Sequence, residues 1–211
     1  MKKKIIPIGI PQVPIKIFEN NTIEWIDIYS LLYQEKVILL FQFLDDDFIN
    51  QLIAMILYLD IENSTKSIYF YINSLGGDLI SGIALYDTIR YVRSNVSTIC
   101  MGITSSISSI ILSSGEKGKR LILPHSRVMI NQPESDYYGQ ASDILIESEE
   151  ILRLRRLLAK IYVEQTNQSL SRIAKDIDRE CFLSSREAQN YGIVDSILQL
   201  YSFQNNYKKT N

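Results

Sequence analysis

The chain has 211 residues, enough for one domain with its own core, and its 22 Lys and Arg against 24 Asp and Glu give a net charge of −2. No basic block is present to follow a phosphate backbone, which argues against nucleic acid as a partner. No apolar run reaches the ~18 residues of a membrane-spanning helix, so we expect no membrane partner. Cys100 and Cys181 lack metal-ligand spacing, and we expect two reduced thiols, no metal and no cofactor.

The chain begins with MKKKIIPIGIPQVP, in which prolines and a glycine interrupt the apolar residues before they reach the length of a signal-peptide core. We therefore interpret residues 1–25 as an N-terminal arm and axial segment. Residues 26–198 form the predicted domain. The polar tail 199–211 is expected to be disordered.

Residue patterns in the domain predict strands that alternate with helices. In chain order we expect a helix at 26–35, a strand at 36–42, a helix at 45–59, a strand at 67–73, a helix at 78–94, a third strand–helix unit within 96–115, short strands at 120–123 and 127–130, a long helix at 140–165, a short helix at 184–192 and a strand at 192–198. Repeated βα units indicate an α/β fold in which helices cover a sheet.

Two predicted turns from a strand into a helix offer chemistry. In INSLGGDL, Gly76 and Gly77 would let backbone N–H groups face an oxyanion or a phosphate, although a tight turn needs glycine for its own sake. In GITSSISS several hydroxyls meet a helix N-terminus, where a serine can be a nucleophile and is more often a cap. Residue types alone leave both alternatives open.

Taken together, YINSLGGDL, GITSS, RVMINQP, GQASD and FLSSREAQNYG resemble the proteolytic subunit of the Clp protease, ClpP, a serine peptidase family that encloses its active sites in a chamber. The resemblance runs from about residue 6 to residue 198. It implies a ClpP/crotonase-like spiral of repeated β-β-α units with a protruding handle helix at about 140–165. A crotonase-like acyl-CoA enzyme shares this architecture, but the N-S-L-G-G and G-x-x-x-S spacings belong to the Clp family.

The resemblance also assigns site residues. It places the nucleophile at Ser106 and the two oxyanion N–H donors at Gly77 and Ile107. Where the family reads R-[IV]-M-I-H-Q-P, this chain reads RVMINQP, so the position of the general base holds Asn131. An amide has no titratable lone pair near neutral pH. Glu180 takes the place of the aspartate that orients the base.

Several other residues are candidates to replace the missing base. His125 is the only histidine, and six strand residues would separate it from the base position by about 20 Å, so we predict that it does not serve. Direct contact of Glu180 with Ser106, or a dyad of that serine with Lys117 or Lys119, remains an alternative.

Further positions depart from the family or match its assembly surfaces. Leu75 replaces a proline, and Glu134-Ser135-Asp136 replaces apolar or glycine-rich residues near the strand that pairs with substrate. Arg179 resembles the arginine that pairs across the contact between rings. The residues that resemble the docking site of a Clp ATPase, or belong to a plain core, are Leu57, Tyr69, Tyr71 and Tyr91.

We therefore expect a catalytically inactive ClpP-like subunit, similar to the ClpR paralogues. It would join active ClpP-type subunits in a hetero-oligomeric pair of heptameric rings and work with a Clp ATPase chaperone. The alternative is a weakly active or unconventional serine endopeptidase that uses Ser106. The arm and the segment WIDIYSLLYQE most resemble plastid-encoded members of the family, which implies a plastid stroma or cyanelle; a bacterial cytoplasm is the alternative.

Overall fold

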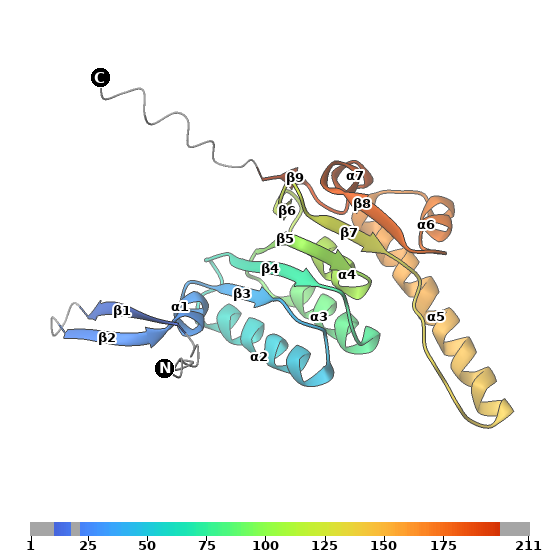
Figure 1. The fold of residues 1–211 in the computed structure, drawn as a ribbon, viewed down its shortest axis with the longest axis horizontal. Helices are drawn as coiled ribbons and strands as arrows, with labels where there is room; N and C mark the ends of the chain where they lie inside the picture. Colours follow the sequence, from blue (N-terminus) through green and yellow to red (C-terminus); the bar gives the residue numbers. More distant parts are fainter. Residues whose placement is uncertain (1–10, 18–21, 199–211) are drawn as a thin grey trace, which may run out of the picture.

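A computed structural model describes residues 11–17 and 22–198 of the chain (Figure 1). Its strands are β1 (Gln12–Ile17), β2 (Thr22–Asp27), β3 (Val37–Leu40), β4 (Ile68–Ser74), β5 (Val96–Ser105), β6 (Arg120–Ile122), β7 (Arg127–Ile130), β8 (Cys181–Ser184) and β9 (Ser196–Ile197). Its helices are α1 (Ile28–Gln34), α2 (Asp46–Glu62), α3 (Leu79–Tyr91), α4 (Ile107–Ser113), α5 (Ala141–Thr166), α6 (Leu170–Asp176) and α7 (Ser185–Tyr191). The predicted tail lies outside the described residues, as do the first ten residues of the arm.

The main sheet has seven strands, and the strand order β3-β4-β5-β6-β9 runs through parallel pairs. Strand β5 is long enough to pair twice. Its first half pairs with β6, and its last three residues, 103–105, pair in parallel with β7. Strand β8 then adds antiparallel to β7. The predicted α/β fold is confirmed.

The core lies between the sheet and the helices α2, α3 and α4. Alternate residues of β4 point into it, so that Ile68, Phe70 and Ile72 are fully buried while Tyr69 and Tyr71 face the other way. Every residue of α4 is buried, which makes this short helix the centre of the packing. Helix α5 packs only its last turns on the domain and projects beyond it (Figure 1), as predicted for the handle.

Two parts of the fold were not predicted from the sequence. Strands β1 and β2 pair as an antiparallel hairpin within the proposed arm, and β2 extends two residues past its boundary at residue 25. The short strand β8 was not predicted, since four residues do not establish a period, and β9 is two residues long rather than seven. Within the described residues, no helix is both long and apolar enough to cross a membrane.

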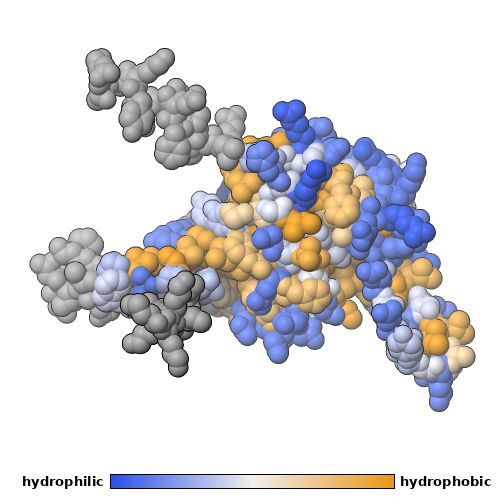
Figure 2. Space-filling model, in the orientation of Figure 1, coloured by the Kyte–Doolittle hydropathy of each residue, from blue (hydrophilic) through white to orange (hydrophobic). Residues whose placement is uncertain are grey.

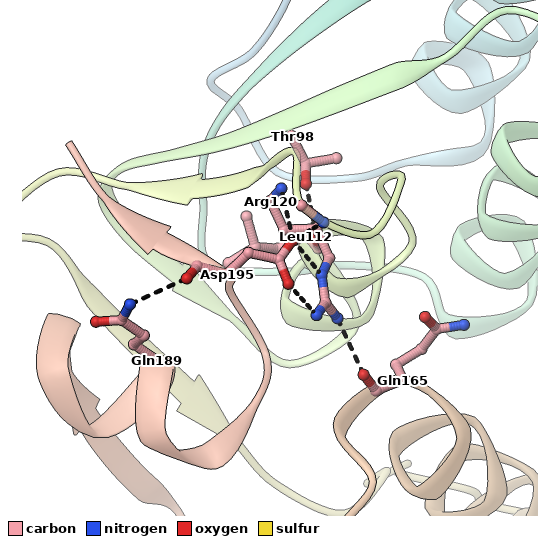
Figure 3. Close-up of polar contacts among 7 residues, drawn as sticks. Thr98, Leu112, Arg120, Gln165, Gln189 and Asp195 are labelled. Carbon is pink, nitrogen blue, oxygen red and sulfur yellow. Dashed lines mark hydrogen bonds and ion pairs between the residues drawn. The ribbon is translucent and has the colours of Figure 1, made fainter.

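A buried ion pair fastens the C-terminal part of the chain to the sheet (Figure 3). The Arg120 guanidinium donates to both carboxylate oxygens of Asp195, at 3.0 and 2.6 Å, and to the carbonyl oxygen of Gln165 at the end of α5, at 3.0 Å. Burial opposes ionisation of Asp195, but the hydrogen bonds and charge of Arg120 outweigh it and lower the pKa of this carboxyl. The pair therefore links β6, α5 and the segment before β9.

We predict that Asp195→Asn lowers the free energy of unfolding by about 2 kcal/mol at pH 7, because it leaves the buried Arg120 without a counter-charge. A carboxyl whose pKa is lower in the folded chain than in the unfolded chain stabilises the fold above about pH 4, and this contribution disappears as the pH falls through the folded pKa. Urea unfolding at several pH values should show the gap to the native chain closing below about pH 4. The exposed control Asp87→Asn should change little, and a gap independent of pH would contradict a role for the charge.

Candidate functional site

One edge of the sheet gathers the residues that the sequence singled out. Strands β4, β5 and β7 are parallel, so their carboxyl ends meet at one edge, where ligands bind in open α/β sheets. Gly76 and Gly77 follow β4, Ser106 follows β5, and Asn131 follows β7. Because β8 is antiparallel to β7, its amino end, preceded by Glu180, returns to the same edge.

The backbone at Ser106 adopts a conformation that L-residues rarely take, with φ 53° and ψ −129°. Its N–H donates to the Met129 carbonyl oxygen on β7 at 3.1 Å, which holds the turn between β5 and α4 in place. Although Ser106 occupies the N-cap position of α4, its hydroxyl makes no capping hydrogen bond. The hydroxyl is therefore not a helix cap, and it stays available at the end of the strand.

The glycine pair lies directly against this turn. A Cβ added to Gly76 would lie 3.0 Å from the Ser106 Cβ, and one added to Gly77 would lie 2.0 Å from the Leu44 carbonyl oxygen. The segment is fixed by hydrogen bonds from Leu44 N–H to Gly76 O and from Asp78 N–H to Leu44 O. Both glycines are thus required for packing, whatever else their backbone does.

Among the backbone N–H groups near Ser106, those of Gly77 and Ile107 have no acceptor in residues 11–17 and 22–198. Ile107 begins α4, where the first N–H groups of a helix have no intrahelical partner and the helix dipole favours negative charge. Such groups can bind an oxyanion that forms on a carbonyl carbon attacked by Ser106.

Asn131 and Glu180 face each other across the β7–β8 pair. The last paired residues are Ile130 and Cys181, so continuing the register by one position sets Asn131 opposite Glu180. The Asn131 Oδ1 is buried and has no hydrogen-bond donor in the described part of the chain. Glu180 is exposed. Both residues line one pocket of about 410 Å³ together with Ser106 and Gly77.

The handle helix completes this pocket, and the sequence did not predict its contribution. Glu147, Ile151, Leu154 and Leu158 come from α5 and line the same space as Ser106. They recur at intervals of three and four residues, so they share one face of the helix. The pocket therefore has an apolar wall beside the retained serine.

The candidate replacement bases lie elsewhere. His125 is exposed in the turn before β7, at the opposite end of that strand from Asn131, as predicted. Lys117 and Lys119 belong to the loop after α4, and neither lines the pocket at the start of that helix. Only Glu180, of the proposed alternatives, lies at the site.

The residues matched to assembly surfaces are not part of the pocket. Arg179 is exposed, and no ion pair of the described residues includes it. Tyr69 and Tyr71 lie on the sheet face away from α2 and α3, whereas Leu57 and Tyr91 lie on those helices. Apolar surface is visible over this sheet and at the tip of α5 (Figure 2). The exposed fractions of the side chains are 37% for Leu57, 43% for Tyr69 and 82% for Tyr91.

These features define an α/β protein that presents a strained serine, two free backbone N–H groups and a lined pocket at the carboxyl edge of a parallel sheet. Residues 19–200 match the Clp protease family model. The chain is 61% identical to an ATP-dependent Clp protease proteolytic subunit of Bigelowiella natans over 192 residues, 91% of this chain and 98% of that protein. Subunits of the same name from Oltmannsiellopsis viridis and Chlorella vulgaris are 51% and 50% identical, over 90% of this chain and 98% and 95% of theirs.

The chain belongs to the Clp protease family, and the resemblance seen in its sequence is confirmed. Its similar relatives come from algae and plants. All three of those compared above carry the name of a proteolytic subunit, without distinction between active and inactive forms.

We predict that Ser106→Gly is more stable than Ser106→Ala by about 1 kcal/mol, because glycine adopts this φ and ψ without strain. Urea unfolding of the two variants measures the difference. The control is Ser148, exposed within α5, where Gly should be less stable than Ala by about 1 kcal/mol. If the alanine variant were more stable than the glycine variant at both positions, strain at Ser106 would be contradicted.

Proposed function

We propose that this chain is a noncatalytic subunit of an ATP-dependent Clp protease, built on the active-site scaffold of its family. The observation that carries the proposal is Asn131 at the family's base position, in the same pocket as Ser106 and across from Glu180. No histidine or lysine lines that pocket. Removing the base of a serine protease lowers turnover by about a million-fold. Ser106 with its N–H donors, Gly77 and Ile107, then supplies too little catalysis for a protease.

The alternative is a slow serine endopeptidase that uses Ser106. It is favoured by one observation, namely that Glu180 lines the pocket and makes no ion pair in the described part of the chain. A carboxylate could accept the proton of the Ser106 hydroxyl. A carboxylate is a weaker base than an imidazole, so the expected rate is low.

In the proposed assembly this subunit occupies positions in a mixed pair of heptameric rings with active ClpP-type subunits, under a Clp ATPase. Clp proteolytic subunits generally form oligomeric rings that work with Clp ATPases. The projecting α5 supports a ring-to-ring contact through its exposed Leu145 and Ile146, whose side chains are 68% and 67% exposed, and Arg179 would add a charge pair there. The plant and algal relatives support a plastid location.

The ATPase would dock through the exposed aromatic and aliphatic residues matched to that role. Leu57, Tyr69 and Tyr91 lie toward the amino ends of the parallel strands, at the edge opposite Ser106. Tyr69 and Tyr71 lie on one side of the sheet, and Leu57 and Tyr91 on the other. We therefore propose that a complete docking site forms between neighbouring subunits.

The first test is labelling of the purified chain by a fluorophosphonate probe, with hydrolysis of a fluorogenic peptide measured in parallel between pH 7 and 9. We predict no labelling and no turnover for the native chain. Asn131→His combined with Glu180→Asp should be labelled, and its turnover should rise by about a thousandfold, because the new imidazole can accept the Ser106 proton.

The control for this test is the same pair of substitutions with Ser106→Ala, which should be silent. Labelling and turnover of the native chain that disappear in Ser106→Ala would overturn the noncatalytic proposal. If Glu180→Gln also abolished that turnover, the serine peptidase alternative would be correct.

A second test concerns assembly. We predict that mixing this chain with an active Clp proteolytic subunit yields particles that contain both chains by native mass spectrometry. Leu145→Glu with Ile146→Glu should abolish the paired-ring particles, because two carboxylates replace exposed apolar side chains at the tip of α5. Ser142→Glu, exposed on the same helix, is the matched control. Particles of each chain alone would contradict a mixed ring.

A further inference from the structure

The pocket beside Ser106 is acidic. Four carboxylate residues line it, and the lining includes no Lys, Arg or His. These are Asp78, Glu134, Glu147 and Glu180. Arg179 precedes Glu180 in the chain but does not line the pocket, and Arg155 is paired with Asp178 at 3.1 Å. An unbalanced negative field therefore fills this space.

Three of the four carboxylates are available to a ligand. Asp78 caps α3 by accepting from the Ser81 N–H at 2.7 Å. Glu134, Glu147 and Glu180 make no ion pair or side-chain hydrogen bond with residues 11–17 and 22–198. They are also not gathered closely enough to hold a metal ion, since no group of three such ligands occurs in the same residues. A cation with several hydrogen-bond donors on a flexible chain suits such spacing better.

The remaining wall of the pocket is apolar. Met129 from β7 and Ile151, Leu154 and Leu158 from α5 line it, and the last two are buried. The long side chains of lysine and arginine bury an aliphatic stem against such a wall while the charged end reaches polar groups. Asn131 lines the same pocket, and its Oδ1 has no donor in the described residues.

The backbone beside the pocket points to a peptide as the carrier of this side chain. Residues 131–139 form no helix or strand, and none of their N–H groups donates to a described backbone group. Unpaired backbone next to a pocket can pair with a peptide strand while alternate side chains of that peptide enter the pocket. A free diamine would bind in the pocket but would not pair with the backbone of residues 131–139.

We propose that the pocket beside Ser106 is a subsite for a lysine or arginine side chain of a bound peptide. Glu147 and Glu180 pair with its charge, Glu134 adds to the negative field around it, and its stem lies along Leu154 and Leu158. The inference rests on the proposed function, because the peptide is held at the serine without being cleaved. It names the substrate class of that site as polypeptides with exposed basic residues.

The test measures binding to the full chain by fluorescence anisotropy. Three fluorescein-labelled decapeptides differ only at one central residue, which is lysine, norleucine or glutamate. At 50 mM salt the lysine peptide should bind about tenfold more tightly than the norleucine peptide, and the glutamate peptide more weakly than both, since two partly exposed charge pairs contribute about threefold each. At 500 mM salt the advantage of lysine should fall to about twofold.

Matched variants test which carboxylates make the lysine peptide bind more tightly. Glu180→Gln and Glu147→Gln should each reduce the lysine advantage about threefold, as neutral amides of the same shape. Glu116→Gln, an exposed carboxylate of the loop before β6, should leave it unchanged. Equal binding of the lysine and norleucine peptides, no binding of either, or the same loss in all three variants would overturn the subsite.

These measurements distinguish failure of the noncatalytic function from failure of the proposed subsite. Serine-dependent cleavage of a peptide by the native chain would overturn the noncatalytic function, and the subsite would still be tested by which of the three peptides is cleaved. A chain that cleaves none of them and binds lysine no better than norleucine would overturn the subsite alone.

Discussion

The structure depends on the double pairing of β5. This strand pairs with β6 through residues 98–100 and with β7 through residues 103–105, so it has to change neighbour in its middle. The change falls at Gly102, which has φ 83° and lies so close to Asn73 that a Cβ would meet its Oδ1 at 2.8 Å. The Ser126 hydroxyl accepts from the Gly102 N–H, and the Asn73 Oδ1 accepts from the Ile103 N–H. These bonds redirect β5 toward β7. Ser106, which follows the last residue of β5, therefore lies at the same pocket as Asn131.

The strained turn at Ser106 is maintained by packing as much as by chemistry. Helix α4 is fully buried, and Ile107 packs so closely on α3 that a Cβ at Gly82 would lie 2.2 Å from its Cγ1. The Ser109 hydroxyl is 2.6 Å from that of Tyr162 on α5. The core therefore requires α4 to start where it does, and the turn that precedes it is kept even if no reaction takes place there. A retained serine in a strained conformation is consistent with an active enzyme and equally with an inactive one.

The positions of Asn131 and Glu180 are not constrained by packing in the same way. Asn131 lies one residue past the end of β7, and Glu180 one residue before β8, where the pair opens toward the pocket. Neither side chain belongs to the core. Substitutions at these two positions change the chemistry and leave the packing of α4 intact.

The sequence predicted the parts of the fold that local patterns specify. The runs that became β4, α2 and α5 are long and periodic, so their apolar spacing indicated both type and position. A short strand such as β8 is stabilised by its partner strand. Its four residues are too few to show a periodic pattern in the sequence. The hairpin of β1 and β2 was missed because its prolines suggested an arm.

The candidate site was predictable only in part, for a related reason. Motifs identified Ser106, Gly77 and Asn131, since each lies in a stretch that resembles the family. The acidic lining could not be predicted, because the nearness of Glu147 to Glu134 and Glu180 follows from tertiary structure alone. A charge distribution in a pocket is a property of several distant segments, and no single stretch carries it.

The acidic lining and the missing base are physically connected. An imidazole at position 131 would lie in the field of carboxylates that have no cationic partner in the described residues, and nearby negative charge raises the pKa of a histidine. A protonated imidazole cannot accept the serine proton, so the imidazole of Asn131→His is expected to act as a base only at a pH above its raised pKa. An asparagine does not titrate, so nearby carboxylates do not change its protonation. With an amide at this position, the carboxylates around Ser106 have no base to perturb, and their charge suits a cationic side chain.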